Sequence, residues 1–257
     1  MKLTFLGTGT SQGVPVIGCN CQVCKSPNIK DKRTRTSVWL HDDSTSILID
    51  SGPDFREQAL KANIQYLDAI LITHNHRDHV AGLDDIRPFN ARQKSAIDLF
   101  IKDSEYDGFK KSFHYIFDPN TQKGGGLPGI CINQIKENKP VVIKGISFMP
   151  LTVFHGEKSI YGFKFGDTVY ITDAKTIPKN SLKQIKGVKN LVINTLRFKQ
   201  HSTHLNLAET LNIVEKTAAE QVYLVHLTHN MDHEILSDIL PSYIRPAYDC
   251  LEIEVNI

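Results

Sequence analysis

The amino-acid sequence predicts an α/β fold in which mixed β-sheets are covered by helices on their outer faces. Short apolar segments typical of strands come in succession and then alternate with helical segments, and this order recurs in both halves of the chain. Polar residues follow four of the apolar segments directly, namely His74, His155, Asp173 and His226. Because strand ends in layered α/β folds open onto one edge, we expect these side chains to assemble a single site there.

Length and composition predict one domain, spanning residues 1–257, without a membrane partner. The chain of 257 residues is 40% hydrophobic and 23% charged, and its formal net charge is +2. No apolar run approaches the length of a membrane span, and the near-neutral charge gives no indication of a polyanionic partner. We therefore expect a soluble, cytoplasmic protein.

Residues 1–129 predict strands followed by strand–helix alternation. A turn-forming segment at 42–45 lies between two strand-like runs and predicts a hairpin. Helical spacing of apolar residues predicts a helix after Pro53, and Pro88 is expected to limit or kink a second one. In chain order we expect strands at 2–6, 36–41 and 46–50, a helix at 52–63, a strand at 68–73, a helix at 81–93, a strand at 96–101, a helix at 104–117 and a loop at 122–129.

Residues 145–257 again predict strands first and then alternation. Gly166 and Asp167 form the expected turn between two of these strands. Asn206 is the expected N-cap of a helix, and Glu209 stands three residues later, in the position of a capping box. In chain order we expect strands at 145–155, 160–165, 168–173 and 190–195, a helix at 206–218, a strand at 221–226, a helix at 232–240 and a strand at 250–255.

The histidine-rich segment after the strand at 68–73 has the chemistry of a metal site. On an extended or turning loop, His74 and His76 can point to the same side and hold one ion. Asp78 and His79 come round the turn and can reach a second ion. Nitrogen and oxygen ligands of this kind suit zinc, manganese or iron. The alternative is a solvated surface loop that is rich in histidine by chance.

The segment T-H-N-H-R-D-H resembles the H-x-H-x-D-H signature of the metallo-β-lactamase-fold hydrolases, and Asp50 and Gly52 match a strand-end pair of that superfamily. The resemblance implies a four-layer αββα sandwich of two similar halves, with the site at one edge. It also implies a dinuclear centre with one ion on His74, His76 and His155, the other on Asp78, His79 and His226, and Asp173 as the bridge. Two divalent ions (zinc, manganese or iron) would activate a bridging hydroxide as the nucleophile.

Three cysteines predict a further, structural metal site. Cys19, Cys21 and Cys24 lie within six positions, and the odd total of five cysteines fits a disulfide framework badly. A closed structural zinc site has four ligands, so a fourth is required. We expect His229 as the fourth ligand and His233 as its competitor; three reduced thiols without a metal are the alternative.

The stretch G-T-G-T-S-Q-G-V-P-V-I-G-C-N-C-Q-V-C narrows the resemblance to the PhnP-like phosphodiesterase subgroup, which carries an extra structural zinc. The match places that zinc in a loop at about residues 11–35, with His229 completing the ligand set. A related loop occurs in PqqB-like proteins, so the loop alone does not identify the substrate. The remaining two cysteines, Cys131 and Cys250, are expected to be buried and inert, and Cys250 stands where the family pattern has glycine.

Hydrolysis of a phosphodiester expels an alkoxide, which a well-placed histidine can protonate. His204 lies just before a helix, and the following L-N-L matches the segment after the proton-donating histidine of the phosphodiesterase subgroup. His201 is the alternative donor, and His204 could instead have a purely structural role at the helix entry. The expected catalytic residues are therefore His204 and Asp78, the latter also as a metal ligand.

The sequence thus predicts a metal-dependent hydrolase that cleaves a small phosphodiester such as a cyclic phosphate. A tRNA 3′-processing nuclease shares the metal core, but the near-neutral charge and the short glycine-rich segment at 122–129 argue against a nucleic-acid partner. The same scaffold would also serve a thioester or lactone hydrolase. A non-catalytic metal-binding protein is a fourth hypothesis, but such a protein has no need of His204. A homodimer is implied by the resemblance only.

Overall fold

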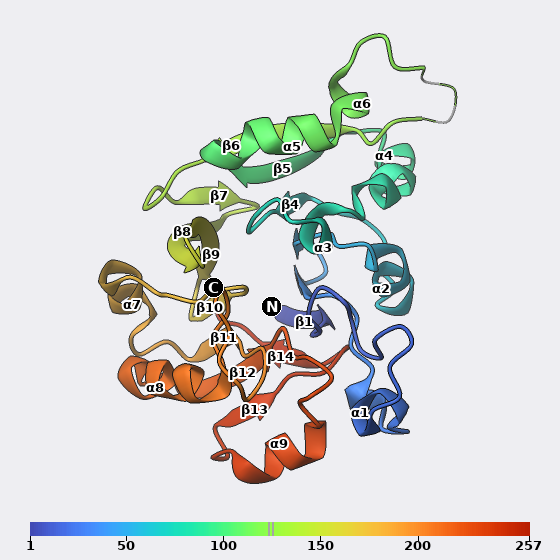
Figure 1. Ribbon diagram of the computed structural model, residues 1–257. Coiled ribbons are helices and arrows are strands. Elements are labelled where there is room, and N and C mark those ends of the chain that lie inside the picture. Colours follow the sequence, from blue (N-terminus) through green and yellow to red (C-terminus); the bar gives the residue numbers. More distant parts are fainter. Residues whose placement is uncertain (123, 125) are drawn as a thin grey trace.

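Two β-sheets lie face to face, and helices cover their outer faces (Figure 1). The structure is a computed structural model that describes residues 1–122, 124 and 126–257. Among these residues each sheet contains seven strands. The αββα sandwich expected from the sequence is confirmed.

The first sheet combines antiparallel and parallel pairing. Its strands in spatial order are β14 (Glu252–Glu254), β1 (Lys2–Gly7), β2 (Ser37–His41), β3 (Ser46–Ile49), β4 (Ala69–Leu71), β5 (Ile97–Lys102) and β6 (Ile130–Ile135). Pairing is antiparallel from β14 to β3 and parallel from β3 to β6. The carboxyl ends of β3 and β4 therefore lie at the same edge.

The second sheet repeats this arrangement. Its strands in spatial order are β13 (Ile244–Pro246), β12 (Gln221–Val225), β11 (Asn190–Asn194), β10 (Thr168–Ile171), β9 (Lys158–Phe165), β8 (Ile146–His155) and β7 (Val141–Ile143). Pairing is antiparallel from β7 to β10 and parallel from β10 to β13. The carboxyl ends of β10, β11 and β12 share an edge, where loops from distant parts of the chain can meet.

Helices form the outer layers. Those of the first half are α2 (Phe55–Lys61), α3 (Arg77–Val80), α4 (Arg87–Gln93), α5 (Tyr106–Ser112) and α6 (His114–Phe117), with 3-10 turns at Leu83–Ile86 and Asp103–Glu105. Those of the second half are α7 (Lys179–Ile185), α8 (Leu207–Thr217) and α9 (His233–Ile239). The cysteine loop contains α1 (Gln22–Lys25) and a 3-10 turn at Ile29–Asp31. In the part of the chain described, no helix has the length and apolar character needed to cross a membrane.

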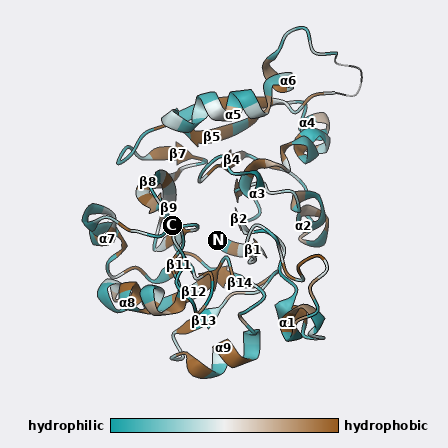
Figure 2. Ribbon diagram, viewed as in Figure 1, coloured by the Kyte–Doolittle hydropathy of each residue, from teal (hydrophilic) through white to brown (hydrophobic). Residues whose placement is uncertain are grey.

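Three buried apolar clusters hold the four layers together. One lies between the sheets and includes Phe5, Phe148 and Phe163. The other two lie beneath the outer helices, around Phe55 in the first half and around Leu224 in the second. Figure 2 shows hydrophilic and hydrophobic residues mixed along α8 and α9, as expected of helices with one buried side. Because burying each large apolar side chain contributes about 1.5–3 kcal/mol, these clusters fix the strand ends in place.

Two local predictions about helix starts are confirmed. The Asn206 side chain accepts a hydrogen bond from Glu209 N at 2.9 Å, and the Glu209 carboxylate accepts one from Asn206 N at 3.0 Å. This capping box begins α8, and it satisfies two amide groups that lack a partner within the helix. Pro88 lies in the first turn of α4, directly after a 3-10 turn, so it limits the helix as expected.

Several elements differ from the sequence prediction. The helix expected at 104–117 is interrupted at Phe113 and forms α5 and α6. Strands β6, β7 and β13 and helix α7 were not expected, because short edge strands and a helix with few apolar residues give weak periodic patterns. Residues 123 and 125 of the loop expected at 122–129 lie outside the described residues.

The expectation that Cys131 and Cys250 are buried is wrong, because both are exposed. Cys131 lies on the solvent side of β6. Cys250 has a φ of 73°, in the left-handed region that favours glycine. That conformation accounts for the glycine of the family pattern at this position.

Candidate metal centres

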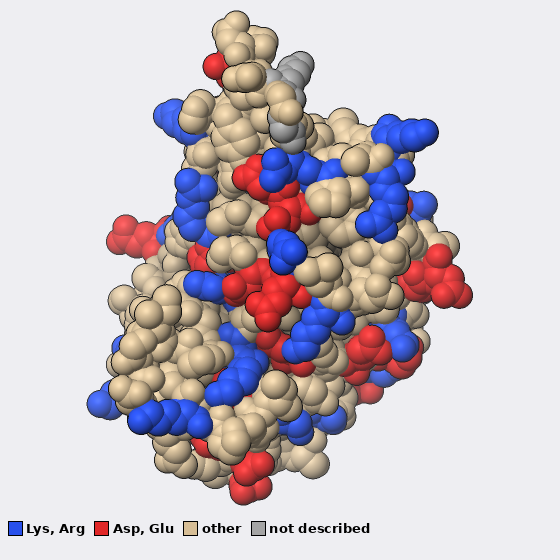
Figure 3. Space-filling model, turned by 90° about the vertical axis from the view of Figure 1, so that its right-hand side faces the viewer, with Lys and Arg blue, Asp and Glu red and all other residues tan. Residues whose placement is uncertain are grey.

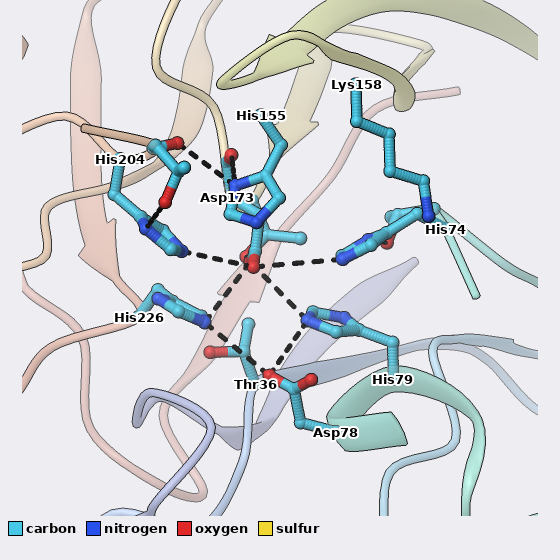
Figure 4. A network of polar contacts seen from close by, with 12 residues as sticks. Thr36, His74, Asp78, His79, His155, Lys158, Asp173, His204 and His226 are labelled. Carbon is cyan, nitrogen blue, oxygen red and sulfur yellow. Dashed lines mark hydrogen bonds and ion pairs between the residues drawn. The ribbon is translucent and has the colours of Figure 1, made fainter. Parts of the chain in front are cut away.

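Three residues of the site lie at strand ends in the left-handed backbone region. Asp50, after β3, has a φ of 66°, Asp173 one of 56° and His226, after β12, one of 58°. Residues other than glycine seldom adopt this conformation unless the surrounding structure enforces it. Here it turns the side chain at the end of each strand toward the edge shared by the two sheets. Figure 4 shows Asp173 and His226 pointing toward the same centre.

Asp173 occupies the middle of the site, with its two oxygens directed at different histidines (Figure 4). Its Oδ1 lies 3.2 Å from His226 Nε2 and 3.4 Å from His79 Nε2. Its Oδ2 lies 3.3 Å from His204 Nε2 and 3.8 Å from His74 Nε2. A carboxylate that faces two groups of ligands in this way is suited to bridge two cations.

One group of ligand atoms comes from α3 and two strand ends. Asp78 Oδ2 lies 3.3 Å from His79 Nε2 and 3.9 Å from His226 Nε2. The ligand atoms of these three residues and of Asp173 all lie within 4.8 Å of one another. The sequence placed Asp78 and His79 on a loop, whereas the structure places them in the first turn of a short helix.

Glycine allows α3 to lie close to the end of β3. A Cβ atom at Gly52 would collide with the backbone oxygen of Asp78, and one at Gly82 would collide with the backbone oxygen of Gly52. Ser51 N donates to His79 O at 2.8 Å, which holds the helix against the strand end. The segment that carries Asp50 and Gly52, the pair recognised in the sequence, therefore determines where Asp78 and His79 lie.

The other group of ligand atoms contains His74, His76 and His155. Those of His74 and His76 lie within 4.8 Å of each other and of Asp173. The His155 ring centroid is 5.1 Å from that of His76 and 5.8 Å from that of His74. His155 and Asp173 also form a compact group with His204. All seven residues expected in the dinuclear centre, and His204 with them, are thus brought together.

Hydrogen bonds to Nδ1, on the side of each ring that faces away from the centre, orient the imidazoles of His79 and His155. His79 Nδ1 donates to Asp50 Oδ2 at 2.7 Å, and His155 Nδ1 faces the carbonyl oxygens of Asp173 (2.9 Å) and Thr203 (3.0 Å). Since a carbonyl or carboxylate oxygen only accepts, Nδ1 must carry the proton in both rings. Nε2 then presents its lone pair to the centre, as a metal ligand does.

Several buried nitrogens of the site need a partner that the protein does not supply. Within the described part of the chain, His74 Nε2, His79 Nε2 and both ring nitrogens of His226 make no hydrogen bond. Buried polar atoms without a partner are rare because each costs about 1–3 kcal/mol. They converge on carboxylates, and this donor set fits divalent cations with nitrogen and oxygen ligands.

The charges of the site reinforce one another. Burial alone would raise the pKa of Asp173, but the adjacent His226 and His79 outweigh it and hold that pKa well below its usual range. Burial alone would lower the pKa of His79, but Asp173 and Asp50 raise it well above its usual range. The carboxylates therefore stabilise positive charge at this position. In the absence of metal that charge is the extra proton on His79, and a bound cation would replace it.

The cysteine loop forms a second compact cluster. The sulfur atoms of Cys19, Cys21 and Cys24 lie 3.2, 3.4 and 3.6 Å from His229 Nδ1, and all four ligand atoms lie within 4.8 Å of one another. The competing His233 instead packs its ring against Tyr248. Three thiols and one imidazole in this arrangement fit a closed tetrahedral zinc site.

Local structure prepares this cluster for a cation. Cys21 is the N-cap of α1, and the hydrogen bond from Cys24 N lowers the pKa of the Cys21 thiol to about 6. Burial raises the pKa of Cys24 to about 11. Because the thiolate is the form that binds metals, Cys21 is the first of these two thiols to become available as a ligand.

A buried arginine joins the cysteine loop to the loop that carries His229. Arg33 Nη2 donates to Asp31 Oδ1 at 3.0 Å and to Met231 O at 2.7 Å, and Nη1 donates to Thr228 O at 3.2 Å. Both charged side chains are almost completely buried. Arg33 therefore fixes the cysteine loop against the loop that carries His229. Its hydrogen bonds go to residues other than the four candidate ligands.

His204 reaches the dinuclear centre, and His201 stands behind it. His204 Nδ1 lies 2.9 Å from Thr203 Oγ1 and 3.2 Å from His201 Nδ1, while Nε2 faces Asp173. Burial lowers the pKa of His204 to about 4. Of the two candidate donors, the structure places only His204 against the centre.

Sequence reasoning missed Lys158, whose side chain lies beside His74 at the edge of the site (Figure 4). Its Nζ lies 3.0 Å from Glu105 Oε2 and donates to Asn75 Oδ1 at 2.7 Å. Burial and then the charge of Lys158 lower the pKa of His76. Lys158 pairs directly with His155 across the hairpin of β8 and β9. Recognition of that hairpin in the sequence would have placed Lys158 next to a site residue.

Comparison with known proteins shows what this chain resembles. The model of the beta-lactamase superfamily domain matches residues 45–227. A solved diphosphatase of the PhnP family has a TM-score of 0.92 and 38% identity, over 100% of this chain and 98% of the other. Zinc-bound PqqB from Methylobacterium extorquens has a TM-score of 0.80 over 99% of this chain and all of the other, but at 17% identity it shows the fold alone.

A further relative is larger than this chain. A protein named octanoyltransferase from Porphyromonas gingivalis is 38% identical over 259 residues, which cover 100% of this chain and 52% of the relative. This chain therefore spans about half the length of that protein. The name belongs to the whole relative, of which only one half is matched.

Proposed function

This chain belongs to the PhnP family of the β-lactamase superfamily, and from that membership we propose that it is a dinuclear metal-dependent phosphodiesterase. The proposed substrate is a small phosphodiester such as a cyclic phosphate. The proposed ligands of the catalytic ions (zinc, manganese or iron) are His74, His76, Asp78, His79, His155, Asp173 and His226, and those of a structural zinc are Cys19, Cys21, Cys24 and His229. When bound, the ion pair would activate water and neutralise charge on the phosphoryl oxygens.

The observation that carries this proposal is the position of His204. Its Nε2 lies 3.3 Å from Asp173 Oδ2, at the edge of the ligand set. A protein that only binds metal has no need of an additional imidazole beside a complete ligand set. A phosphodiesterase needs one, because the alkoxide leaving group must be protonated as it departs.

The environment of His204 suits this role once an anion is bound. Burial lowers the pKa of His204 to about 4, so the ring is neutral at neutral pH in the free protein. A phosphodiester anion beside the ring would favour the imidazolium and raise that pKa. Thr203 and His201 hold the ring through Nδ1, which leaves Nε2 directed at the site.

Surface charge is in keeping with a small substrate. Figure 3 shows lysine and arginine side chains interspersed with aspartate and glutamate on one face of the molecule. Tight binding of a nucleic acid requires many phosphate contacts from a basic surface, and the formal net charge of this chain is only +2.

An acyl substrate is the second candidate, because the Porphyromonas gingivalis relative is named octanoyltransferase. Activated water at a dinuclear centre can attack a thioester carbonyl as well as a phosphoryl group. Against this candidate stands His204, since a thiolate leaves without needing a proton. A diphosphate, the class in the name of the solved PhnP-family relative, would also be attacked at phosphorus, but it expels a phosphate, which needs a proton less than an alkoxide does.

The test compares leaving groups in the metal-replete protein. Glycerol cyclic phosphate expels an alkoxide that needs a proton, whereas bis-p-nitrophenyl phosphate expels a stable phenolate. We expect His204→Ala to slow hydrolysis of the cyclic phosphate by roughly 10²–10⁴-fold, the usual worth of a general acid. The nitrophenyl ester should lose at least tenfold less, and metal content per chain should stay constant.

The control is His114→Ala, which removes an exposed histidine of α6. It should leave both rates unchanged. Equal losses on the two phosphodiesters together with loss of a metal ion would make His204 a ligand rather than an acid. Turnover of a thioester with no turnover of either phosphodiester would replace the lead proposal by the acyl candidate.

A further inference from the structure

A closed group of three side chains holds the residue between His74 and His76. Asn75 N donates to Glu105 Oε2 at 3.1 Å, and Lys158 Nζ donates to Asn75 Oδ1 at 2.7 Å. Lys158 Nζ also lies 3.0 Å from Glu105 Oε2, which closes the group. We refer to Asn75, Glu105 and Lys158 as the Asn75 clamp. Because Asn75 stands between two candidate ligands, any displacement of it would move both imidazoles.

The Asn75 clamp joins three distant parts of the chain. Asn75 follows β4, Glu105 ends the 3-10 turn after β5, and Lys158 begins β9 of the other sheet. Glu105 is only 7% exposed, and a buried carboxylate is tolerated where donors satisfy it. Both of these donors come from outside its own turn. Burying the Glu105 charge therefore costs least when the segment of His74 and the hairpin of β8 and β9 are both in place.

Two further contacts hold the same segment. Tyr161 N of β9 donates to Thr73 O at 3.0 Å, so β9 contacts the residue before His74 as well as the residue after it. Gly108 lies in α5, and a Cβ atom there would lie 2.7 Å from Asn75 Nδ2. Since a real Cβ atom does not approach another heavy atom so closely, α5 packs directly against Asn75 only because residue 108 is glycine.

The other half of the centre has its own support. Asp78 and His79 lie on α3, which packs against the end of β3 at Gly52, where a Cβ atom would collide with Asp78 O. The contacts that join the members of the Asn75 clamp lie outside this helix. Loss of the clamp should therefore move one group of candidate ligands and leave the other in place.

We propose that Glu105 and Lys158 are positioning residues that set the affinity of only one ion of the centre, the ion whose proposed ligands include His74 and His76. They act through Asn75 and are not ligands themselves. Since the ammonium and the carboxylate form a neutral pair, they order the segment without adding net charge beside the ions. The inference rests on the dinuclear centre of the proposed function.

Equilibrium dialysis tests this inference. Chelator-treated protein is dialysed against a series of Mn²⁺ buffers, and manganese is counted apart from zinc. We expect wild type to bind two manganese ions per chain. Lys158→Met should need about 10- to 100-fold more free Mn²⁺ to take up its second ion, the usual effect of losing an outer contact of a ligand. Anomalous diffraction should place the ion that remains among Asp78, His79 and His226.

The direction of the change separates positioning from charge. Lys158→Met removes a positive charge near the ions, so charge alone would strengthen Mn²⁺ binding. Lys158→Arg keeps the charge and can still donate to Asn75, so it should regain most of the lost affinity. Asn75→Ala removes the acceptor of Lys158 but leaves Glu105 paired with the lysine, and it should weaken the same ion as Lys158→Met.

The matched control is Lys102→Met. Lys102 is a partly buried lysine of β5, and its Nζ donates to Ser159 O at 2.9 Å and to Ser159 Oγ at 2.6 Å. It has no hydrogen bond to Asn75 among the described residues, so its loss should leave the affinity for both ions as in wild type.

Three results would overturn the inference and leave the proposed function standing: equal weakening of both ions, unchanged uptake in Lys158→Met and Asn75→Ala, or a remaining ion held by His74 and His76. Selective weakening of one ion in a protein that turns over no phosphodiester would overturn the proposed function and leave the inference standing. Fewer than two manganese ions in wild type would overturn the dinuclear centre and the inference with it.

Discussion

At the scale of single residues, the candidate dinuclear centre depends on side chains outside the proposed ligand set. Asp50 is fully buried and accepts hydrogen bonds from His79 Nδ1, Thr73 N and Thr73 Oγ1. Thr73 Oγ1 also lies 3.1 Å from His74 Nδ1. Asp50 thus reaches His79 directly and His74 through Thr73, so one carboxylate orients a ligand from each half of the centre.

Replacing Asp50 should therefore impair both sites without removing a ligand. In Asp50→Asn the amide keeps the size of the side chain but loses the charge that fixes the His79 tautomer. We expect metal affinity and kcat/KM to fall by about 10- to 100-fold, the usual effect of losing an outer hydrogen bond to a ligand. Competition with a chelator measures the affinity. Asp42→Asn, on the exposed hairpin turn, should behave as wild type, and equal affinities in the two variants would contradict the role of Asp50.

At the scale of elements, the cysteine loop has little regular structure of its own. Its helix α1 has only four residues, and an isolated helix of that length does not form in water. The small apolar cluster of Val14, Val23 and Cys24 adds little area. The Arg33 contacts hold the loop in place, and a zinc bound to its thiols would stabilise it further.

Removing one thiol should release that zinc and leave the catalytic ions. We expect Cys21→Ser to lower bound zinc by about one equivalent per chain and to lower the Tm, since binding energy of a structural zinc contributes to folding. Metal analysis and thermal unfolding measure the two effects. The matched control is Cys131→Ser, which alters an exposed thiol of β6 and should change neither. Unchanged zinc content in Cys21→Ser would exclude the site.

Elements and ligands were predicted from the sequence with unequal success. The side chains that converge at the candidate centre could be chosen because H-x-H-x-D-H is a local pattern and because His155, Asp173 and His226 each follow an apolar strand. The contacts of Asp50 with His79 and of Lys158 with Asn75 and Glu105 could not, because they join parts of the chain that are distant in sequence. The short edge strands were missed for the same reason, since pairing with a neighbour rather than local pattern makes them strands.

At the scale of the whole molecule, one half-buried carboxylate joins the C-terminal part of the chain to the N-terminal part. Asp249 Oδ1 accepts from Thr8 Oγ1 at 2.8 Å, and Oδ2 accepts from Thr34 N and Thr34 Oγ1 at 2.8 and 2.7 Å. Burial outweighs these hydrogen bonds and raises the pKa of Asp249 from 3.8 to about 6. The folded protein therefore holds a proton that the unfolded chain has released between these values.

This shift makes stability depend on pH in a definite direction. Because the folded pKa is raised, the stabilisation from Asp249 is fully present below about pH 4 and is lost as pH rises through about 6. A shift of about two units corresponds to on the order of 2–3 kcal/mol. We expect the stability of wild type relative to Asp249→Asn, from urea unfolding of both, to fall by that order between pH 4 and pH 7. Titration of the histidine ligands cancels in this difference, and parallel pH profiles would contradict the prediction.

The loop after β12 contributes His226 to one centre and His229 to the other, with only two residues between them. An insertion or deletion there would displace one imidazole while the other stayed in place. In homologous chains that keep both centres, the length of this loop should therefore be invariant while surface loops vary. Homologues that lack the three cysteines have no need to keep this loop length. A change in the number of residues between the two histidines should therefore accompany loss of the proposed structural zinc.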